Sequence, residues 1–600
     1  MDQGAPCCFL NSYIPSFASI INMNGLRRIL TAPADLSTVP APPETHNWRL
    51  YTMALSASCA SACFGYDSSF IGGTIKLDSF TRTFGITDAN ETAISSHLTS
   101  LFQAGAFFGA ILVYPITERF GRRPALIIAA LVFCIGAILQ TVSNGNIPLM
   151  YGARVLSGLG VGSSSLVTPN YISENSTPAL RGQLVGLFEI ILQVSLVFGF
   201  WIVYGVKLNI PDDGSNKQWQ IPFALQLIPG GLLIICMFIQ SESPRWLIKK
   251  GKLDQARAVL SRIRHLESSH PYLDYEIQSV QAQIAKELGG HSKPTFFQKV
   301  KEALGKRNRS RLGLGVALMW LQNLSGINSI NYYSNTLITK IGFTGDTVSL
   351  LATGVFGIVK MVSTLLFMFF VIDKVGRRKP LLFGSIFAAF AMFYIGAYSV
   401  NAGSFDHTVP KDGRAYFALV SIYIFGVSYC CSWNAIPWIF QSEVFGMNVR
   451  ALSMVVTTCA QWLSQFVIVY STPYMIADLK GWTFIFFGLW VCFGMCFAYL
   501  FVPETKEISL EDMDILFAGP VLASKKREHY NEVLAAKRIQ IEQSAGRETL
   551  AKGQDQWMTT EEEKAAAMKR REAGLDSAKA TTEDIDHQQS ARKEVGENIA

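Results

Sequence analysis

Long apolar stretches separated by polar connections make up most of the chain between residues 48 and 503. An α-helix needs about 20 such residues to cross the hydrocarbon core of a bilayer. The pattern predicts twelve spanning helices, six before a long polar connection and six after it. Their expected bounds are 50–72, 94–116, 125–142, 149–172, 184–206, 221–240, 312–337, 349–372, 380–400, 416–440, 452–475 and 482–502.

The composition agrees with residence in a lipid bilayer and excludes several classes of protein. Half of the 600 residues are apolar and only 16% are charged, whereas a soluble domain has about 25% charged residues. The net charge of +7 is concentrated in the connections and the tail, and no basic patch with interleaved aromatic residues indicates a nucleic-acid partner. The 11 cysteines have no metal-ligand spacing, so neither a metal nor another cofactor is expected.

Basic residues in the connections predict the orientation in the membrane. They follow the second and eighth spans and fill the connection 241–311, and such residues are enriched on the cytosolic side. Both termini are then expected in the cytosol. The expected domains are an N-terminal arm (1–47), a six-helix bundle (48–240), a helical cytosolic linker (241–311), a second six-helix bundle (312–503) and a largely disordered cytosolic tail (504–600). Residues 253–266 and 275–288 of the linker have amphipathic patterns.

One carboxylate interrupts the first apolar stretch. Asp67 lies inside the expected span 50–72, where a charge costs at least about 2.5 kcal/mol. An ionisable group at that depth is a functional candidate, and it predicts a proton-coupled carrier. The alternative is an aspartate that a partner neutralises and that is retained only for folding.

The two halves of the chain repeat the same charged motifs. Gly121-Arg122-Arg123 after the second span recurs as Gly376-Arg377-Arg378 after the eighth. The charges expected at the cytosolic face are Glu118, Arg122, Arg123, Glu174, Arg181, Glu242 and Arg245 in the first half, and Asp373, Arg377, Arg378, Glu443 and Arg450 in the second. An excess of basic residues inside explains isolated cations, but it does not explain carboxylates at the same offsets in both halves. We therefore expect ion pairs between helices that latch the cytosolic face when the carrier is open outward, with a substrate site near the midplane where the parallel repeats meet.

On these motifs the chain resembles the sugar porter branch of the major facilitator superfamily, over about residues 48–517. The resemblance rests on the two Gly-Arg-Arg motifs, Arg154, Glu174 to Gly182, Ser241-Glu242-Ser243-Pro244-Arg245, Gln322 to Tyr333 and Pro503-Glu504-Thr505-Lys506. Within that branch the chain is most similar to the fungal quinate-permease-like members, judging by Gly65-Tyr66-Asp67-Ser68 and Ser325 to Tyr333. The resemblance implies an all-α membrane protein with twelve transmembrane helices in two parallel-related halves, working as a monomer in the plasma membrane.

The resemblance also implies a substrate site built from amides. The positions that match the family's sugar-contacting residues are Gln193, Gln322, Asn323, Asn328 and Gln461, and Trp433 matches its stacking aromatic. Amides suit a polyhydroxylated ring because each offers a donor and an acceptor. Asn323 and Asn434 depart from the family's usual Gln and Gly, which leaves the pocket width open. Alternatively, these polar residues only form hydrogen bonds between helices.

Asp67 and Arg154 form the expected coupling pair. A carboxyl group beside a cation is ionised, and one buried alone is neutral, so movement relative to Arg154 would switch the protonation of Asp67. The resemblance supports this role, because facilitative sugar carriers tend to have a neutral residue at the Asp67 position. The alternative role for Arg154 is that of a structural anchor.

Two further charges within the expected spans bear on the substrate. Lys360 interrupts the eighth span, and Glu189 lies one helical turn before Gln193. Neutral-sugar porters often have an amide in place of Lys360, so this cation could receive the carboxylate of quinate or of a sugar acid. Alternatively, Lys360 compensates Glu189 or Asp67, since two acidic and two basic residues within the spans balance.

The sequence thus predicts a symporter that uses protons to import a monosaccharide across the plasma membrane by alternating access. Quinate or a sugar acid is the alternative substrate, and a transporter-like sugar sensor with a long tail is the alternative of another class. The sequence contains neither a Walker loop nor a nucleophile paired with a base, so no motif indicates an enzyme.

Overall fold

The computed structural model describes residues 47–177, 180–288, 296–343, 345–407, 409–445, 449–506 and 513–533, with the single residues 42, 45, 508 and 535. These described residues are mostly helical, and none of them is in a strand. The helices up to Lys526 belong to one compact unit. Most of the expected N-terminal arm and of the expected tail lies outside the described residues.

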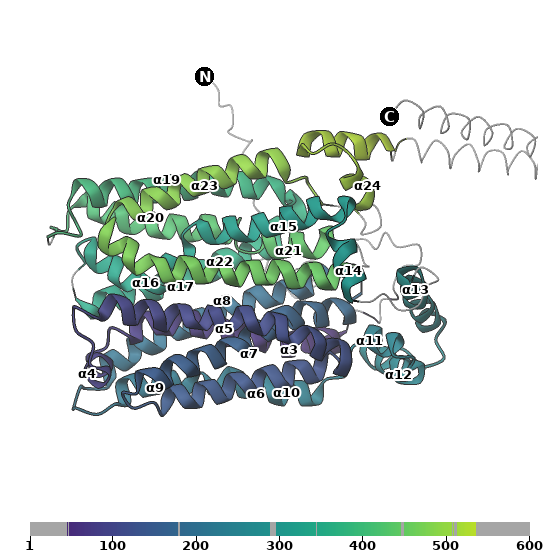
Figure 1. Cartoon of the computed structure of the whole chain (residues 1–600), viewed down its shortest axis with the longest axis horizontal. Helices are drawn as coiled ribbons and strands as arrows, with labels where there is room; N and C mark the ends of the chain where they lie inside the picture. The colour runs from purple at the N-terminus through teal and green to yellow at the C-terminus, as the bar shows by residue number, and fades with distance from the viewer. Residues whose placement is uncertain are drawn as a thin grey trace, which may run out of the picture. The chain divides into compact units, whose positions relative to one another are not determined.

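The first half of the chain contains six helical spans (Figure 1). They are α3 (Trp48–Thr74), α5 (Glu91–Phe120), α6 (Arg122–Thr141), α7 (Ile147–Asn175), α8 (Arg181–Asn209) and the pair α9 (Lys217–Leu225) and α10 (Leu227–Ile239). The short helix α4 (Asp78–Phe84) lies in the connection between α3 and α5. Each of the first six expected spans therefore coincides with a helix, and the sixth is interrupted at Gln226.

Six spans follow in the second half. They are α15 (Lys306–Leu324) with α16 (Ile327–Lys340), α17 (Asp346–Leu366) with the π-helical turn η2 (Phe367–Val371) and α18 (Ile372–Val375), α19 (Arg378–Asn401), α20 (Gly413–Cys430) with α21 (Ile436–Val444), α22 (Arg450–Asp478) and α23 (Trp482–Phe501). The seventh span breaks between α15 and α16 at Gly326, whose φ of 87° lies in the left-handed region. Glycine adopts this region at little cost because it lacks a Cβ atom.

Four short helices form the connection between the halves. They are α11 (Pro244–Lys249), α12 (Leu253–Arg264), α13 (Pro271–Leu288) and α14 (Phe296–Ala303). α12 and α13 confirm the two amphipathic segments expected in the linker. α15 begins at Lys306, ahead of the expected linker boundary at residue 311, because its first turns are basic rather than apolar. α24 (Met513–Ala518) follows the last span.

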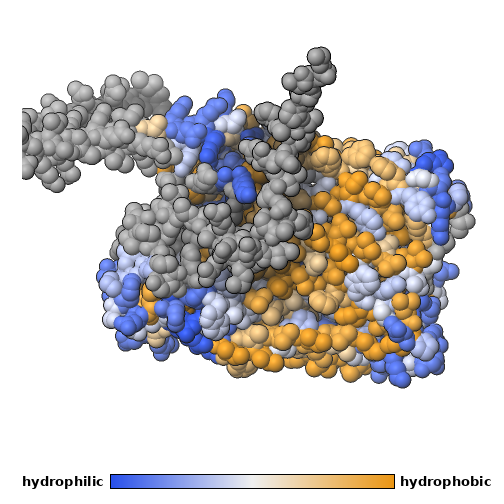
Figure 2. Space-filling view, turned by 180° about the vertical axis from the view of Figure 1, so that it is seen from behind, coloured by the Kyte–Doolittle hydropathy of each residue, from blue (hydrophilic) through white to orange (hydrophobic). Residues whose placement is uncertain are grey.

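The surface of the bundle fits a bilayer. Among the described residues, nine helices or helix pairs are long and apolar enough to cross a membrane. α3, α7 and the α15–α16 pair are less apolar than these nine, because they contain many small and polar residues. With these three, the helical spans number the twelve expected. Figure 2 shows a broad hydrophobic face between hydrophilic ends. Phe238, Phe383 and Phe493, on three different helices, are more than half exposed on the bundle surface, as lipid-facing side chains would be.

Glycines let α5 and α7 pack backbone against backbone. A Cβ atom at Gly105 would overlap the carbonyl oxygen of Val155, and one at Gly162 would overlap that of Ala106. Small residues allow this close approach between membrane helices. The contact holds α7, and with it Arg154, against α5.

Gly162→Ala should lower the melting temperature of the purified protein by several degrees, because overpacking costs about 1–3 kcal/mol. Thermal unfolding in detergent, followed by tryptophan fluorescence, measures the change. Gly152→Ala on the same helix is the matched control, since nothing lies within 4 Å of its Cβ position, and it should leave the melting temperature unchanged. Equal losses in the two variants would contradict a backbone contact at Gly162.

Candidate functional site

A buried salt bridge lies inside the first half. Asp67 on α3 and Arg154 on α7 are both 0% exposed. Arg154 Nη2 lies 3.2 Å from Asp67 Oδ2, and Nη1 contacts Oδ1. Arg154 Nε donates to the carbonyl oxygen of Leu98 on α5 at 2.8 Å, and the guanidinium group lies 5.0 Å from the ring centroid of Phe102. The structure thus brings together the two residues expected to couple the proton, and it ties three helices to one pair.

A tyrosine of the second half reaches the neighbour of Asp67. The hydroxyl group of Tyr332 on α16 accepts a hydrogen bond from Gln103 Nε2 at 2.8 Å and donates to Ser68 Oγ at 3.3 Å. Gln103 and Ser68 belong to the first half. Tyr332 therefore links the second half to the segment that carries Asp67.

Two more hydrogen bonds join α5, in the first half, to residues of the second half. The hydroxyl groups of Thr99 and Tyr333 lie 2.8 Å apart, and Ser96 Oγ donates to the carbonyl oxygen of Tyr470 at 2.7 Å. They join the first part of α5 to Tyr333 on α16 and to the later part of α22. No role was expected for Tyr333 from the sequence, although a phenol in an apolar helix needs a polar partner.

Buried amides of the second half form a network. Asn323 Nδ2 on α15 donates to Gln461 Oε1 at 2.8 Å and to Ser464 Oγ at 2.6 Å, both on α22. Asn328 Nδ2 on α16 donates to Asn323 Oδ1 at 2.6 Å. Three of the expected substrate residues are therefore in direct contact, and Ser464 joins them without having been anticipated.

The other expected substrate residues lie apart from this network. Gln322 Nε2 donates to the carbonyl oxygens of Trp433 at 2.8 Å and Asn434 at 2.9 Å, at the break between α20 and α21. Trp433 Nε1 donates to Ser385 Oγ on α19 at 2.8 Å. Gln193 on α8 is buried, and its Oε1 has no hydrogen-bond partner among the described residues.

Lys360 and Glu189 are each held by an asparagine. Lys360 Nζ on α17 donates to Asn331 Oδ1 at 2.9 Å, and Glu189 Oε2 on α8 accepts from Asn434 Nδ2 at 3.1 Å. Lys360 is 1% exposed and Glu189 is 7% exposed. Their only side-chain hydrogen bonds within the described part of the chain are these two, so the two charges do not pair directly there. Neither asparagine was anticipated as a partner.

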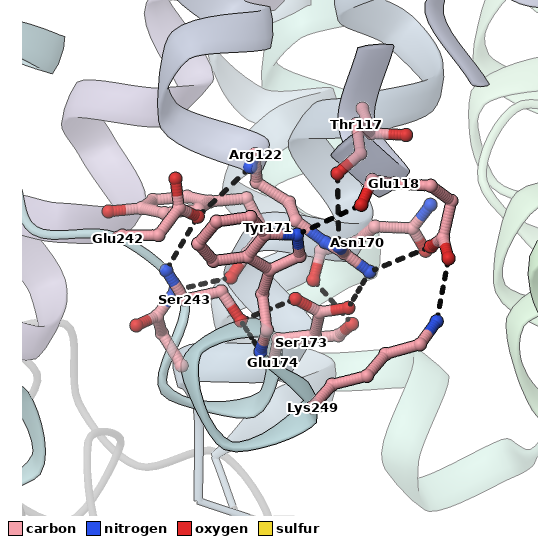
Figure 3. Close-up of polar contacts among 12 residues, drawn as sticks. Thr117, Glu118, Arg122, Asn170, Tyr171, Ser173, Glu174, Glu242, Ser243 and Lys249 are labelled. Atoms are coloured by element: carbon pink, nitrogen blue, oxygen red, sulfur yellow. Dashed lines mark hydrogen bonds and ion pairs between the residues drawn. The ribbon is translucent and has the colours of Figure 1, made fainter. Parts of the chain in front are cut away.

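The charged residues around the Gly-Arg-Arg motif of the first half form a compact cluster (Figure 3). Arg122 Nη2 lies 2.9 Å from Glu174 Oε1, and Ser243 Oγ donates to Glu174 Oε2 at 2.5 Å. Glu242 accepts from the backbone N–H groups of Arg122 at 2.9 Å and Arg123 at 3.1 Å. Burial raises the pKa of the Glu242 carboxyl, and the hydrogen bonds that it accepts from backbone N–H groups oppose this rise.

The second half repeats the cluster atom for atom. Arg377 Nη2 lies 2.9 Å from Glu443 Oε1, and Thr505 Oγ1 donates to Glu443 Oε2 at 2.7 Å. Glu504 accepts from the backbone N–H groups of Arg377 at 2.8 Å and Arg378 at 3.0 Å. Glu504 was part of the motif that carried the resemblance, but its place in the cluster was not anticipated.

The glycine of each Gly-Arg-Arg motif is required by this geometry. Gly121 has a φ of 107° and Gly376 a φ of 93°, both in the left-handed region. A Cβ atom at either position would also overlap the carboxylate of Glu242 or Glu504. Only glycine therefore allows the carboxylate to reach the two following N–H groups.

The structure places some of the other charges that were expected at the cytosolic face. Glu118 Oε2 lies 2.6 Å from Lys249 Nζ, and Glu118 Oε1 lies 3.7 Å from Arg122. The side chains of Arg181 and Asp373 lie outside the described residues, and Arg245 and Arg450 both have interaction partners. In the part of the chain that the structure describes, the ion pairs of Arg122 and Arg377 join helices of the same half. Their expected role, to latch the cytosolic face when the carrier is open outward, stays a prediction.

Twelve helical spans in two halves with repeated charge clusters define a multi-pass membrane protein with the major facilitator fold. Solved structures show the same fold. That of the proton:xylose symporter XylE with a bound bromodeoxyglucose has a TM-score of 0.66 at 24% identity and covers 78% of this chain and 99% of its own. The inward-open conformation of XylE from E. coli has a TM-score of 0.62 with the same identity and coverage.

The family model described as sugar (and other) transporter matches residues 53–517, and the chain belongs to this family of transporters. A protein named probable quinate permease from Aspergillus flavus is 42% identical over 489 residues, which are 80% of this chain and 90% of that protein. The quinate permease of Emericella nidulans is 40% identical over 488 residues, with the same coverage. The chain is therefore a membrane transporter and not an enzyme, as the sequence predicted.

Glu174→Gln should lower the melting temperature, because this partly buried carboxylate contacts both Arg122 and Ser243, and leaving such a charged partner unsatisfied costs about 1–3 kcal/mol. Glu443→Gln should have a similar effect, because its carboxylate makes the same two contacts. Glu118→Gln is the control, since this more exposed carboxylate contributes at most about 1 kcal/mol. A loss in Glu118→Gln as large as in Glu174→Gln would contradict the central place of Glu174 in the cluster.

Proposed function

We propose that the chain is a symporter that imports a polyhydroxylated cyclic substrate together with protons across the plasma membrane by alternating access. The observation that carries this proposal is the fully buried pair of Asp67 and Arg154. A charge pair inside a bilayer is costly, and such residues mark ion and proton pathways in transporters. The pair also favours transport over the alternative of a sensor.

Protonation of Asp67 removes its charge and weakens its attraction to Arg154. Arg154 keeps its hydrogen bond to the Leu98 carbonyl, so the change falls mainly on α3. Ser68 is the next residue on α3, and it accepts the hydrogen bond of Tyr332 from the other half. A proton on Asp67 thereby alters a contact between the halves, which makes proton binding and substrate binding mutually reinforcing.

We infer that the substrate is a cyclic hydroxy acid of the quinate or sugar-acid class. Lys360 is buried, and it has only the neutral partner Asn331 for a hydrogen bond in the described part of the chain. A substrate carboxylate would pair with the Lys360 ammonium group through a charge-assisted hydrogen bond. The relatives named quinate permease, at 40–43% identity, support the same class.

A neutral monosaccharide is the second candidate. The network of Asn323, Asn328 and Gln461 offers amide donors and acceptors for ring hydroxyl groups. The unpartnered Oε1 of Gln193 adds a buried acceptor. XylE, which has the same fold, is described as a proton:xylose symporter.

We place the linker and both termini in the cytosol, and we take the monomer as the functional unit. Arg119, Arg123 and the basic linker lie at one end of the helices, and an excess of Lys and Arg marks the cytosolic side. The clusters around Glu174 and Glu443 lie at that end. We assign them, with Arg181, Arg245, Asp373 and Arg450, to the cytosolic gate.

Cells that lack other carriers should alkalinise weakly buffered medium when quinate or galacturonate is added, because each imported substrate brings a proton with it. External pH and uptake of quinate, galacturonate, glucose and xylose are recorded in parallel. Asp67→Asn should abolish accumulation against a gradient while exchange of labelled substrate continues. Asp88→Asn, at an exposed position, is the matched control and should behave like the unaltered chain. Uptake without alkalinisation, or full accumulation by Asp67→Asn, would contradict proton coupling at Asp67.

Lys360→Asn should raise the KM for quinate at least about tenfold, a loss of about 1.4 kcal/mol, because the substrate carboxylate loses its cation. The KM for glucose should change far less. Uptake of both substrates, fitted over a range of concentrations, gives the two values. Lys340→Asn, at an exposed position near the end of α16, controls for the loss of one positive charge. Equal losses for acid and hexose would assign Lys360 to charge compensation of Glu189.

A further inference from the structure

Two cations share one aromatic ring where the last span meets the segment that follows it. Arg311 Cζ on α15 lies 5.1 Å from the ring centroid of Phe517 on α24, and Lys526 Nζ lies 4.5 Å from the same centroid. Arg311 is 1% exposed and Lys526 is 3% exposed. Arg311 Nη2 also lies 3.4 Å from the carbonyl oxygen of Met513. Neither the coupling pair nor the substrate site explains this cluster.

The charge of Lys526 is not balanced locally. Within the described part of the chain, the contact of its ammonium group is the face of Phe517, and no carboxylate forms an ion pair with it. Burial, with the nearby charge of Arg311, lowers the pKa of Lys526 to about 8. A buried cation is stabilised by a counter-ion. Lys526 is therefore suited to an anion that the described residues do not supply.

A cavity of about 200 Å³ adjoins the cluster. Lys526 and Ser310 form its polar lining, and Phe497, Phe501 and Val521 form much of its apolar lining. Phe497 and Phe501 lie on α23, whose neighbouring side chains Phe493 and Tyr499 are more than half exposed. The cavity thus has a basic part beside the outer surface of a spanning helix.

We propose that this cavity binds the phosphate headgroup of an anionic phospholipid from the cytosolic leaflet. Lys526 supplies the positive charge, and the hydroxyl group of Ser310 supplies a hydrogen-bond donor. Basic pockets between helices on the cytosolic side are suited to such headgroups. The apolar lining from α23 gives the acyl chains a surface to lie on, which a free phosphate would not use. The inference rests on the cytosolic placement of this end, and it does not depend on the substrate or on proton coupling.

The test uses the full chain in a neutral detergent and dioctanoyl phosphatidylinositol 4-phosphate as the probe. A ligand that binds the folded state raises its melting temperature as its concentration increases. The anionic lipid should give a saturable rise, whereas dioctanoyl phosphatidylcholine and the free headgroup inositol 1,4-bisphosphate should give little or none. An equal rise with phosphatidylcholine would overturn the anionic site. An equal rise with the free headgroup would overturn a lipid as its occupant.

Lys526→Gln should weaken the lipid affinity at least about fivefold, a loss of about 1 kcal/mol. Lys525→Gln, one residue away and exposed, removes the same charge and should bind like the unaltered chain. Lys526→Arg should also retain binding. If Lys526→Gln fails to fold, Ser310→Ala should still weaken binding about twofold. Equal affinities of Lys526→Gln and Lys525→Gln would overturn the site.

Transport is measured separately from lipid binding. Substrate-driven alkalinisation in cells that express the unaltered chain reports on the proposed symport alone. The lipid-dependent shift in melting temperature needs no substrate and no proton gradient. If no alkalinisation is seen, the lipid-dependent melting temperature can still be interpreted, and the reverse also holds.

Discussion

The buried salt bridge between Asp67 and Arg154 constrains much of the first half. Two charges inside a bilayer are tolerated only when they pair closely and their remaining donors are satisfied. Here α3 supplies the carboxylate, α7 the guanidinium group, and α5 both the carbonyl oxygen of Leu98 and the ring of Phe102. The glycines that bring α5 and α7 together are therefore part of the same arrangement, because a wider spacing would leave Arg154 Nε without its acceptor.

The two halves are alike at the end that carries the Gly-Arg-Arg motifs and different in their interiors. Arg122 with Glu174, and Arg377 with Glu443, repeat the same atoms and nearly the same distances. These clusters lie where the helices end and where unpaired backbone groups need partners, a requirement that both halves share. In contrast, the buried salt bridge lies in the first half and the amide network around Asn323 lies in the second. Proton and substrate would thus act on different halves.

The spans were predictable from the sequence because the thickness of the bilayer sets the length of apolar helix that each span needs. The sequence did not predict the breaks at Gln226 and Gly326 or the break between α20 and α21, because each lies inside a stretch long enough to cross the bilayer as one helix. The pairing of Asp67 with Arg154 was predictable because an unpaired charge would be costly in either span. The contacts of Lys360 with Asn331 and of Glu189 with Asn434 were not, because an asparagine in a polar stretch gives no sign of its partner. The contact of Tyr332 with Ser68 depends on how the halves meet, which no local pattern encodes.

α16 connects these separate sites physically. It begins after the left-handed turn at Gly326, and within six residues it carries Asn328, Asn331 and Tyr332. The first contacts the amide network, the second holds Lys360, and the third bonds to the residue beside Asp67. A small rotation of the first turns of α16 about Gly326 would change all three contacts together, because the three residues lie between Gly326 and the kink at Tyr333, where φ is −117° and ψ is 15°. In the proposed symport, coupling between a proton in the first half and a substrate in the second therefore needs no long chain of residues, since one helix touches both proposed sites.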